Sequence, residues 1–187
     1  MAAPTLIIID VERGFDLPSW GERNNPEAES KIAEALTAWR THGAPVIHVR
    51  HESSGDDGDD IFIPGTQAVD FKPEALPLDG EPVITKNVNS AFIGTDLEEC
   101  LRRDGVEAVA IAGLTTDHCC STTARMAANL GFETWVLADA MATFAREAPD
   151  GELIPAGEMH RTALASLNQE FAEILDTSEA VARLERA

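Results

Sequence analysis

Short apolar runs without alternation recur along the chain, and segments of helical periodicity separate them. Continuous apolar runs rich in β-branched residues are typical of strands that are covered on both faces of a parallel sheet. They predict six strands, at residues 5–11, 45–50, 82–86, 106–112, 133–138 and 172–176. Apolar residues at helical spacing predict helices at 27–41, 95–103, 121–130 and 158–171, and a helical tail at 178–187.

This alternation of strands and helices predicts the fold. It favours an α/β domain in which a mostly parallel, doubly wound sheet of about six strands lies between two helical layers, a Rossmann-like α/β/α sandwich. The length of 187 residues is typical of a single domain, so we expect one domain over residues 1–187. Residues 51–80 are rich in Gly, Asp, Pro and Ser, and we expect them to form a lid or cap loop.

The charge narrows the classes of partner. A formal net charge of -19 disfavours nucleic acid and anionic membrane surfaces as partners. The first residues lack a basic region and their apolar run stops at Asp10, so we expect a cytoplasmic protein without a membrane span. Cys100, Cys119 and Cys120 cannot all pair, which favours reduced thiols over a disulfide framework.

Candidate chemistry gathers at the carboxyl ends of three predicted strands. Asp10 follows the first strand, Lys86 ends the third, and Cys119 follows the fourth in the segment 113–125. Because parallel strands place such ends at one edge of the sheet, we expect a carboxylate, an ammonium group and a thiol to share one crevice. A cysteine in the first turn of a helix feels the positive end of the helix dipole, which predicts a stabilised thiolate.

As a set, these segments resemble the isochorismatase-like cysteine hydrolases, the superfamily that includes nicotinamidases and N-carbamoylsarcosine amidase. The resemblance covers nearly the whole chain and rests on Asp10 and the stretches 86–97, 113–119 and 130–140. It implies a catalytic triad, a cis peptide bond and an oxyanion hole. The triad is Asp10, Lys86 and Cys119, the cis bond joins Leu114 to Thr115, and the backbone N–H groups of Thr115 and Cys119 form the hole.

The resemblance also implies an activity. We expect hydrolysis of a C–N bond in a small amide, urea, lactam or imide through a thioester, without a cofactor, in a homodimer or larger homo-oligomer. Two alternatives stay open: a vinyl-ether hydrolase of the isochorismatase type, and a non-enzymatic, redox-sensing protein with a reactive thiol. Adjacent helical residues point about 100° apart. We therefore expect Cys120 to lie in the core and His118 not to reach Cys119.

Two departures from the family pattern concern the surroundings of the triad. Nicotinamidases often carry a metal bound through an Asp-x-His element, whereas the matching stretch 48–51 has His48 and His51 but no Asp. These two residues point to opposite faces of an ideal strand, so we expect no catalytic metal. Glu12 stands where many relatives have Gln, and we expect it to alter the hydrogen bonding around the site.

Substrate specificity is expected to reside in residues of the strand-end loops. Aromatic side chains there favour a planar substrate, although packing within the lid explains them equally well. Arg50 is a candidate for binding a substrate carboxylate, and an arginine paired with an acidic residue is an equal alternative. The candidate pocket residues are Phe15, Trp20, Arg50, His51, Phe62, Asn87 and Phe144.

Overall fold

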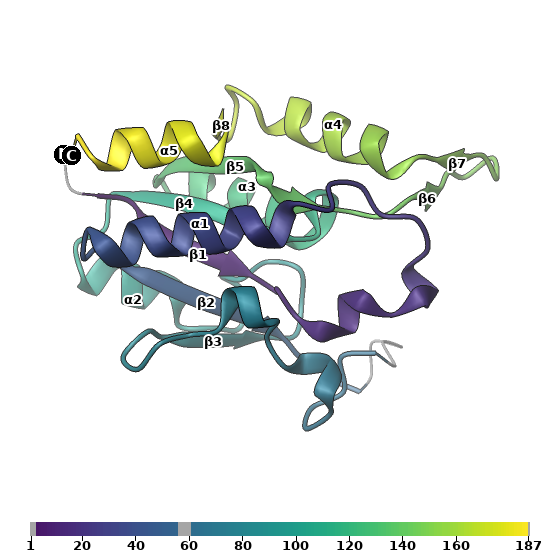
Figure 1. The fold of residues 1–187 in the computed structure, drawn as a ribbon, viewed down its shortest axis with the longest axis horizontal. Helices are drawn as coiled ribbons and strands as arrows, with labels where there is room; N and C mark the ends of the chain where they lie inside the picture. Colours follow the sequence, from purple (N-terminus) through teal and green to yellow (C-terminus); the bar gives the residue numbers. More distant parts are fainter. Residues whose placement is uncertain (1–2, 56–60, 187) are drawn as a thin grey trace.

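Six parallel strands form one sheet in the computed structural model, which describes residues 3–55 and 61–186 (Figure 1). The order across the sheet is β3-β2-β1-β4-β5-β8. Counted among themselves, these strands follow the order 3-2-1-4-5-6 of a doubly wound sheet, which confirms the predicted fold class. Their bounds are Thr5–Ile9 for β1, Val46–His51 for β2, Val83–Lys86 for β3, Ala108–Leu114 for β4, Glu133–Ala142 for β5 and Glu173–Leu175 for β8.

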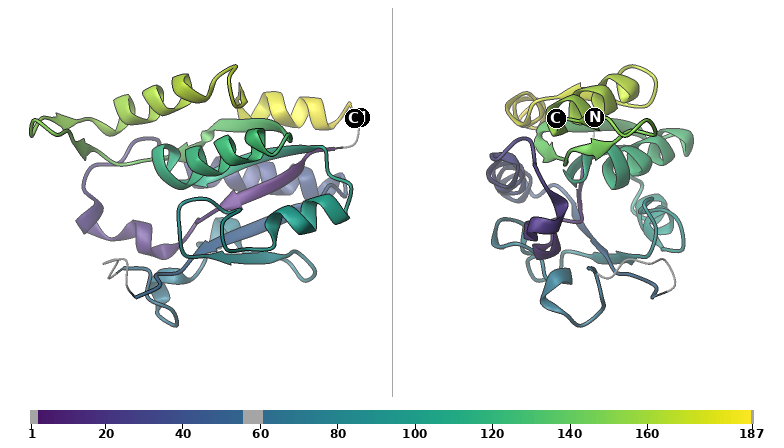
Figure 2. Two further views of the ribbon diagram at one scale, coloured as in Figure 1. Left: turned by 180° about the vertical axis from the view of Figure 1, so that it is seen from behind. Right: turned by 90° about the vertical axis from the view of Figure 1, so that its right-hand side faces the viewer.

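Helices cover both faces of the sheet (Figure 2). Side chains of α1 (Ala28–Thr41) and α5 (Thr177–Leu184) pack with Leu6 and Ile8 of β1 in one core. Side chains of α2 (Leu97–Arg103), α3 (Ser121–Asn129) and α4 (Ala156–Leu167) pack with Ile7 and Ile9 in the other core. Because alternate residues of β1 enter opposite cores, all four are fully buried. This two-sided burial explains why the strand is continuously apolar.

The extent of β5 and α4 and the presence of a hairpin between them differ from the sequence-based expectations. β5 continues to Ala142, beyond the expected end at residue 138, and a register irregularity interrupts its pairing with β4. A short antiparallel hairpin, β6 (Arg146–Glu147) and β7 (Leu153–Ile154), follows it and has no apolar alternation that would reveal it. α4 ends at Leu167, four residues early, because the chain reverses at Gln169, whose φ is 68°.

The segment expected to be a lid lies against the carboxyl end of β1. Residues 56–60 of it are outside the described residues. Arg13 N–H donates to Asp70 O, and Lys72 N–H donates to Val11 O, both at 2.9 Å. Short 3-10 helices at Arg13–Asp16, Pro18–Trp20, Gln67–Val69 and Pro73–Ala75 fold the two segments over each other. Within the described parts of the chain, no helix has the length and apolarity needed to cross a membrane.

Gly113 permits the closest approach between the two central strands. It pairs with Ile9 in the β1–β4 ladder, and its φ is 132°, in the region that L side chains rarely adopt. A Cβ atom at this position would lie 2.0 Å from Ile9 O. Asp10 and Leu114 directly follow this contact, so the glycine sets the separation of the two strand ends.

Gly113→Ala is therefore expected to lower the free energy of unfolding by about 2–4 kcal/mol, because the strands must separate to admit the methyl group. The matched control is Gly157→Ala in α4, where a Cβ meets open space. The control should leave stability unchanged or raise it by up to about 1 kcal/mol. Equal denaturation midpoints for the two variants would contradict the role assigned to Gly113.

Candidate active site

Asp10 occupies the carboxyl end of the central strand β1. Its φ is 49°, a left-handed conformation that Asp adopts more readily than most residues, and the residue is fully buried. Its backbone N–H donates to Val49 O at 2.9 Å, which continues the pairing with β2. The chain thus turns at Asp10 while its carboxyl group stays inside the molecule.

Lys86, the last residue of β3, brings the expected groups together. β3 and β1 are separated by β2, about 10 Å by the usual strand spacing, and the long lysine side chain bridges that gap. Its Nζ atom lies 2.6 Å from Asp10 Oδ2 and 3.4 Å from Cys119 Sγ. A third contact, of 3.1 Å, joins Nζ to His51 Nδ1 at the end of β2. The lysine is 1% exposed, so its charge is compensated inside the protein.

Cys119 lies in a π-helical turn, Thr116–Cys120, rather than in the first turn of an α-helix as expected. This turn follows a cis peptide bond between Leu114 and Thr115, at the position that the resemblance implies. Thr115 O accepts hydrogen bonds from the N–H groups of His118 and Cys120, which fixes the turn. Cys120 is fully buried and belongs to the core, as predicted.

The expected thiolate is a second correction. Burial and the neighbouring Asp10 carboxylate raise the pKa of the Cys119 thiol well above its ordinary value, against the lowering effect of Lys86. Burial by itself lowers the pKa of Lys86, but Asp10 and Cys119 reverse this and raise it. The resting site therefore holds a neutral thiol beside an ammonium–carboxylate pair, because Asp10 already compensates the positive charge of Lys86.

Glu12 is a further buried acid beside this pair. The residue is fully buried, and its Oε1 accepts a hydrogen bond of 2.6 Å from the His51 N–H. Burial and the Asp10 carboxylate raise the pKa of Glu12 to about 10. Glu12 thereby contacts His51, one of the residues that also touches Lys86.

Four of the candidate pocket residues form one aromatic cluster. Phe15 lies at the centre, with ring centroids 5.0 Å from Trp20, 4.8 Å from Phe62 and 6.2 Å from Phe144. The His51 ring meets Phe62 edge to face at 5.5 Å, which connects the cluster to Lys86. Leu114 packs in the same cluster, so the aromatic rings adjoin the turn that carries Cys119.

Other candidate residues have partners within the protein. Arg50 lies in β2, pairs with Glu52 at 3.5 Å, and stacks over the Phe71 ring. Asn87 is exposed, and its Nδ2 donates to Glu52 O. The contact with Glu52 favours the acid-paired alternative for Arg50.

The two histidines of the stretch 48–51 face different groups. His48 Nε2 lies 2.9 Å from Glu81 Oε2, whereas His51 faces Lys86. Among residues 3–55 and 61–186, no three His, Cys, Asp or Glu side chains are grouped so that they could hold a metal ion.

A polar network beside the cysteine turn escaped the sequence interpretation. Asp117 accepts hydrogen bonds from Thr143 and from Arg146 Nε, and Arg146 Nη2 lies 3.4 Å from His118 Nδ1. The contacts of His118 are thus directed to Arg146 and Asp117, in line with the expectation that it does not reach Cys119. Nothing in the sequence pattern identified Arg146 as the partner of Asp117.

His160 of α4 is a second missed residue. Its Nδ1 lies 2.8 Å from Thr116 Oγ1, at the start of the cysteine turn. The helical pattern placed His160 in a helix but gave no sign of the residue that it would contact.

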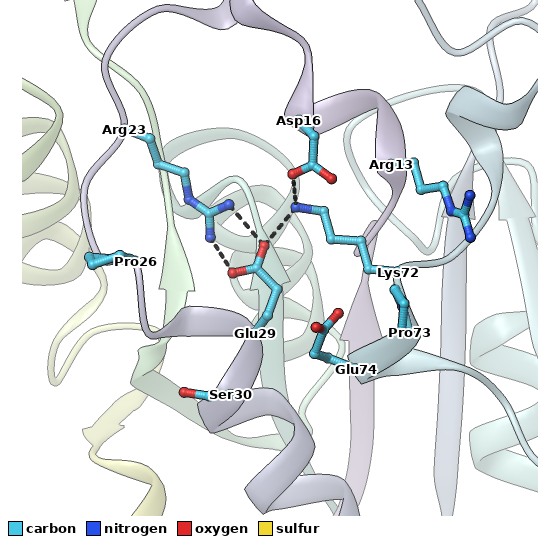
Figure 3. Close-up of a pocket in the computed structure, with 9 residues that line it drawn as sticks. All are labelled: Arg13, Asp16, Arg23, Pro26, Glu29, Ser30, Lys72, Pro73 and Glu74. Carbon is cyan, nitrogen blue, oxygen red and sulfur yellow. Dashed lines mark hydrogen bonds and ion pairs between the residues drawn. The ribbon is translucent and has the colours of Figure 1, made fainter.

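A separate hollow of about 700 Å³ lies between the loop after β1 and the segment 72–74 (Figure 3). Lys72 lines this hollow, and its Nζ lies 2.5 Å from Asp16 Oδ1 and 2.7 Å from Glu29 Oε1. Arg23 forms a bidentate pair with Glu29. The charged groups at its centre compensate one another, and none of the three expected catalytic residues lines it. We interpret these pairs as the attachment of the segment containing Lys72 to helix α1.

Comparisons with known proteins agree with this architecture. The family model described as the isochorismatase domain matches residues 4–179. The isochorismatase family protein YrdC of Bacillus subtilis is 44% identical over 94% of this chain and 93% of its own length. Nicotinamidase 3 of Arabidopsis thaliana is 30% identical over 91% of this chain and 83% of its own.

Solved structures show the same similarity. A protein of the isochorismatase family from Chromobacterium violaceum, described as a hydrolase by family, superposes with a TM-score of 0.94 at 40% identity, over 98% of this chain and 94% of the other. The match of the family model over most of the chain, together with these similarities in sequence and fold, shows that the protein belongs to the isochorismatase family of hydrolases.

Proposed function

We propose that the protein is a cysteine-dependent hydrolase that cleaves a C–N bond of a small amide, urea, lactam or imide through a thioester intermediate. The observation that carries the proposal is the position of Lys86 Nζ, 2.6 Å from the Asp10 carboxylate and 3.4 Å from the Cys119 sulfur, in a buried site. A nucleophile, a proton acceptor and an orienting cation in contact meet the requirements of covalent catalysis.

The first half of the proposed reaction transfers a proton within the site. Because the Cys119 thiol is neutral at rest, Asp10 accepts its proton as the sulfur attacks the carbonyl carbon. Once Asp10 is protonated, the positive charge of Lys86 stabilises the developing thiolate rather than the Asp10 carboxylate. The backbone N–H groups of Thr115 and Cys119 stabilise the tetrahedral oxyanion, and Asp10 returns the proton to the departing nitrogen.

The second half hydrolyses the thioester. Asp10 is again a carboxylate after the amine leaves, and it removes a proton from a water molecule that attacks the acyl carbon. The oxyanion forms in the same place, and its collapse releases the acid and the Cys119 thiolate. Sulfur regains its proton from Asp10, so the site returns to its starting protonation state.

The surroundings support a small, planar substrate. The cluster of Phe15, Trp20, Phe62 and Phe144 adjoins the cysteine turn through Leu114 and gives that side of the site an apolar, aromatic wall, although three of its rings are buried against one another. The name of the similar Arabidopsis protein, a nicotinamidase, favours an amide bond as the target. The raised pKa of Cys119 disfavours a redox sensor, because peroxide-reactive thiols are those with thiolate character.

Cys119→Ser is expected to lower the rate of hydrolysis by at least about 10³-fold, since the hydroxyl group is a much weaker nucleophile in this site. Small primary amides, ureas, lactams and cyclic imides are screened for released ammonia or ring-opened product. The matched control is Cys100→Ser in α2, which carries the same change at a partly buried cysteine outside the triad. Full activity in Cys119→Ser would exclude the thioester route.

Asp10→Asn and Lys86→Met each leave one buried charge without its partner, and each is expected to cost about 3 kcal/mol of stability and to abolish turnover. Asn suits the left-handed backbone of Asp10, and Met approximates the lysine stem. The double variant should lose less stability than the sum of the two single losses yet remain inactive. Denaturant unfolding and the ammonia assay measure the two effects, and additive stability losses would contradict the pairing.

A further inference from the structure

Glu12 is joined to the triad through the end of β2. Its Oε1 accepts the His51 N–H at 2.6 Å, and the His51 ring places Nδ1 3.1 Å from Lys86 Nζ. The backbone of Glu12 also forms an isolated antiparallel bridge with Phe71. Glu12 therefore holds the strand end from which a partner of Lys86 projects.

The two cations that act on Glu12, Lys86 and Arg50, each have another acidic partner, and burial and Asp10 outweigh their effect. Lys86 is engaged by Asp10, and Arg50 is paired with Glu52 and stacked on Phe71. Glu12 Oε2 is buried and has no hydrogen-bond partner among the described residues. An unpartnered carboxylate oxygen beside the Asp10 carboxylate is strongly disfavoured, whereas a neutral carboxylic acid is tolerated.

We infer that Glu12 is a positioning residue of the triad that is held as a neutral carboxylic acid, anchors His51 against Lys86, and leaves Asp10 as the sole carboxylate that shares the Lys86 charge. The inference rests on the proposed function for the meaning of the triad, but not for the state of Glu12. Burial and Asp10 raise the pKa of Glu12 to about 10, which agrees with a proton held at neutral pH.

The charge of Glu12 affects how Lys86 shares its own charge among its three contacts, Asp10, His51 and Cys119. A second anion near Lys86 would draw its charge away from the thiol and would repel the Asp10 carboxylate. The Oε1 atom accepts the His51 N–H whether or not Oε2 carries a proton, so a neutral side chain of the same shape preserves the anchor. The Glu12→Gln variant has such a neutral side chain and keeps the acceptor for the His51 N–H. The Glu12→Ala variant removes that acceptor.

Infrared spectroscopy tests the protonation state directly. At pH 7 we expect the wild-type protein to show the carbonyl stretch of a protonated carboxylic acid, and we expect Glu12→Gln to lose it. Glu185→Gln, the same change at an exposed position at the end of α5, should retain the band. The absence of the band in the wild type, or its survival in Glu12→Gln, would overturn the inference.

The pH dependence of unfolding gives a second, independent readout. The pKa of Glu12 is about 10 in the folded chain and about 4.5 ordinarily, so the unfolded chain releases a proton that the folded chain keeps. The contribution of Glu12 to stability is thus fully present below pH 4.5 and is lost as the pH rises toward 10. Relative to Glu12→Gln, the wild-type unfolding constant should rise by about tenfold per pH unit between pH 5 and 9. A ratio that does not change with pH contradicts a neutral Glu12.

Alkylation of Cys119 by iodoacetamide, in a Cys100→Ser background, tests the positioning role without any substrate. Glu12→Gln should retain the wild-type alkylation rate at pH 7. The alkylation rate of Glu12→Ala should differ from that of the wild type by about tenfold, because His51 is no longer held against Lys86. Equal rates in all three proteins would leave Glu12 without a positioning role. None of these measurements requires turnover, so their failure is distinguishable from a failure to find a hydrolysed amide.

Discussion

The buried ammonium group of Lys86 is the constraint on which the site depends. A lysine that is 1% exposed is strongly destabilising unless nearby groups compensate its charge. Three residues contact the ammonium group: Asp10 after β1, His51 at the end of β2, and Cys119 in the turn after β4. Four segments that are distant in the sequence must therefore meet at one point for the chain to fold, and the point where they meet is the candidate active site.

The sheet provides this meeting point because its order reverses between β1 and β4. Loops that leave two neighbouring strands in opposite directions open a crevice at their carboxyl ends. Gly113 keeps the two strands close, and Asp10 turns its carboxyl group inward through a left-handed backbone conformation. The packing of the two cores thus fixes the strand ends that carry the candidate groups, and the contacts of Lys86 hold their side chains together.

The sequence revealed the architecture and the gathering of Asp10, Lys86 and Cys119, because both follow from local patterns and from parallel strand direction. It could not reveal the protonation states. The position of Cys119 near a helix start suggested a thiolate, yet the balance of burial, Asp10 and Lys86 decides otherwise. The partners of Arg50, Arg146 and His160 were equally hidden, because long-range side-chain contacts leave no periodic signal in the chain.

The neutral thiol has a consequence for the proposed chemistry. When a proton moves from Cys119 to Asp10, negative charge moves from oxygen to sulfur while Lys86 remains in contact with both. The net charge of the buried site does not change, so the step needs little reorganisation of solvent. A second ionised carboxylate would break this balance by favouring the proton on Asp10 before substrate arrives. A neutral Glu12 is therefore the condition under which the other three groups can exchange charge inside the protein.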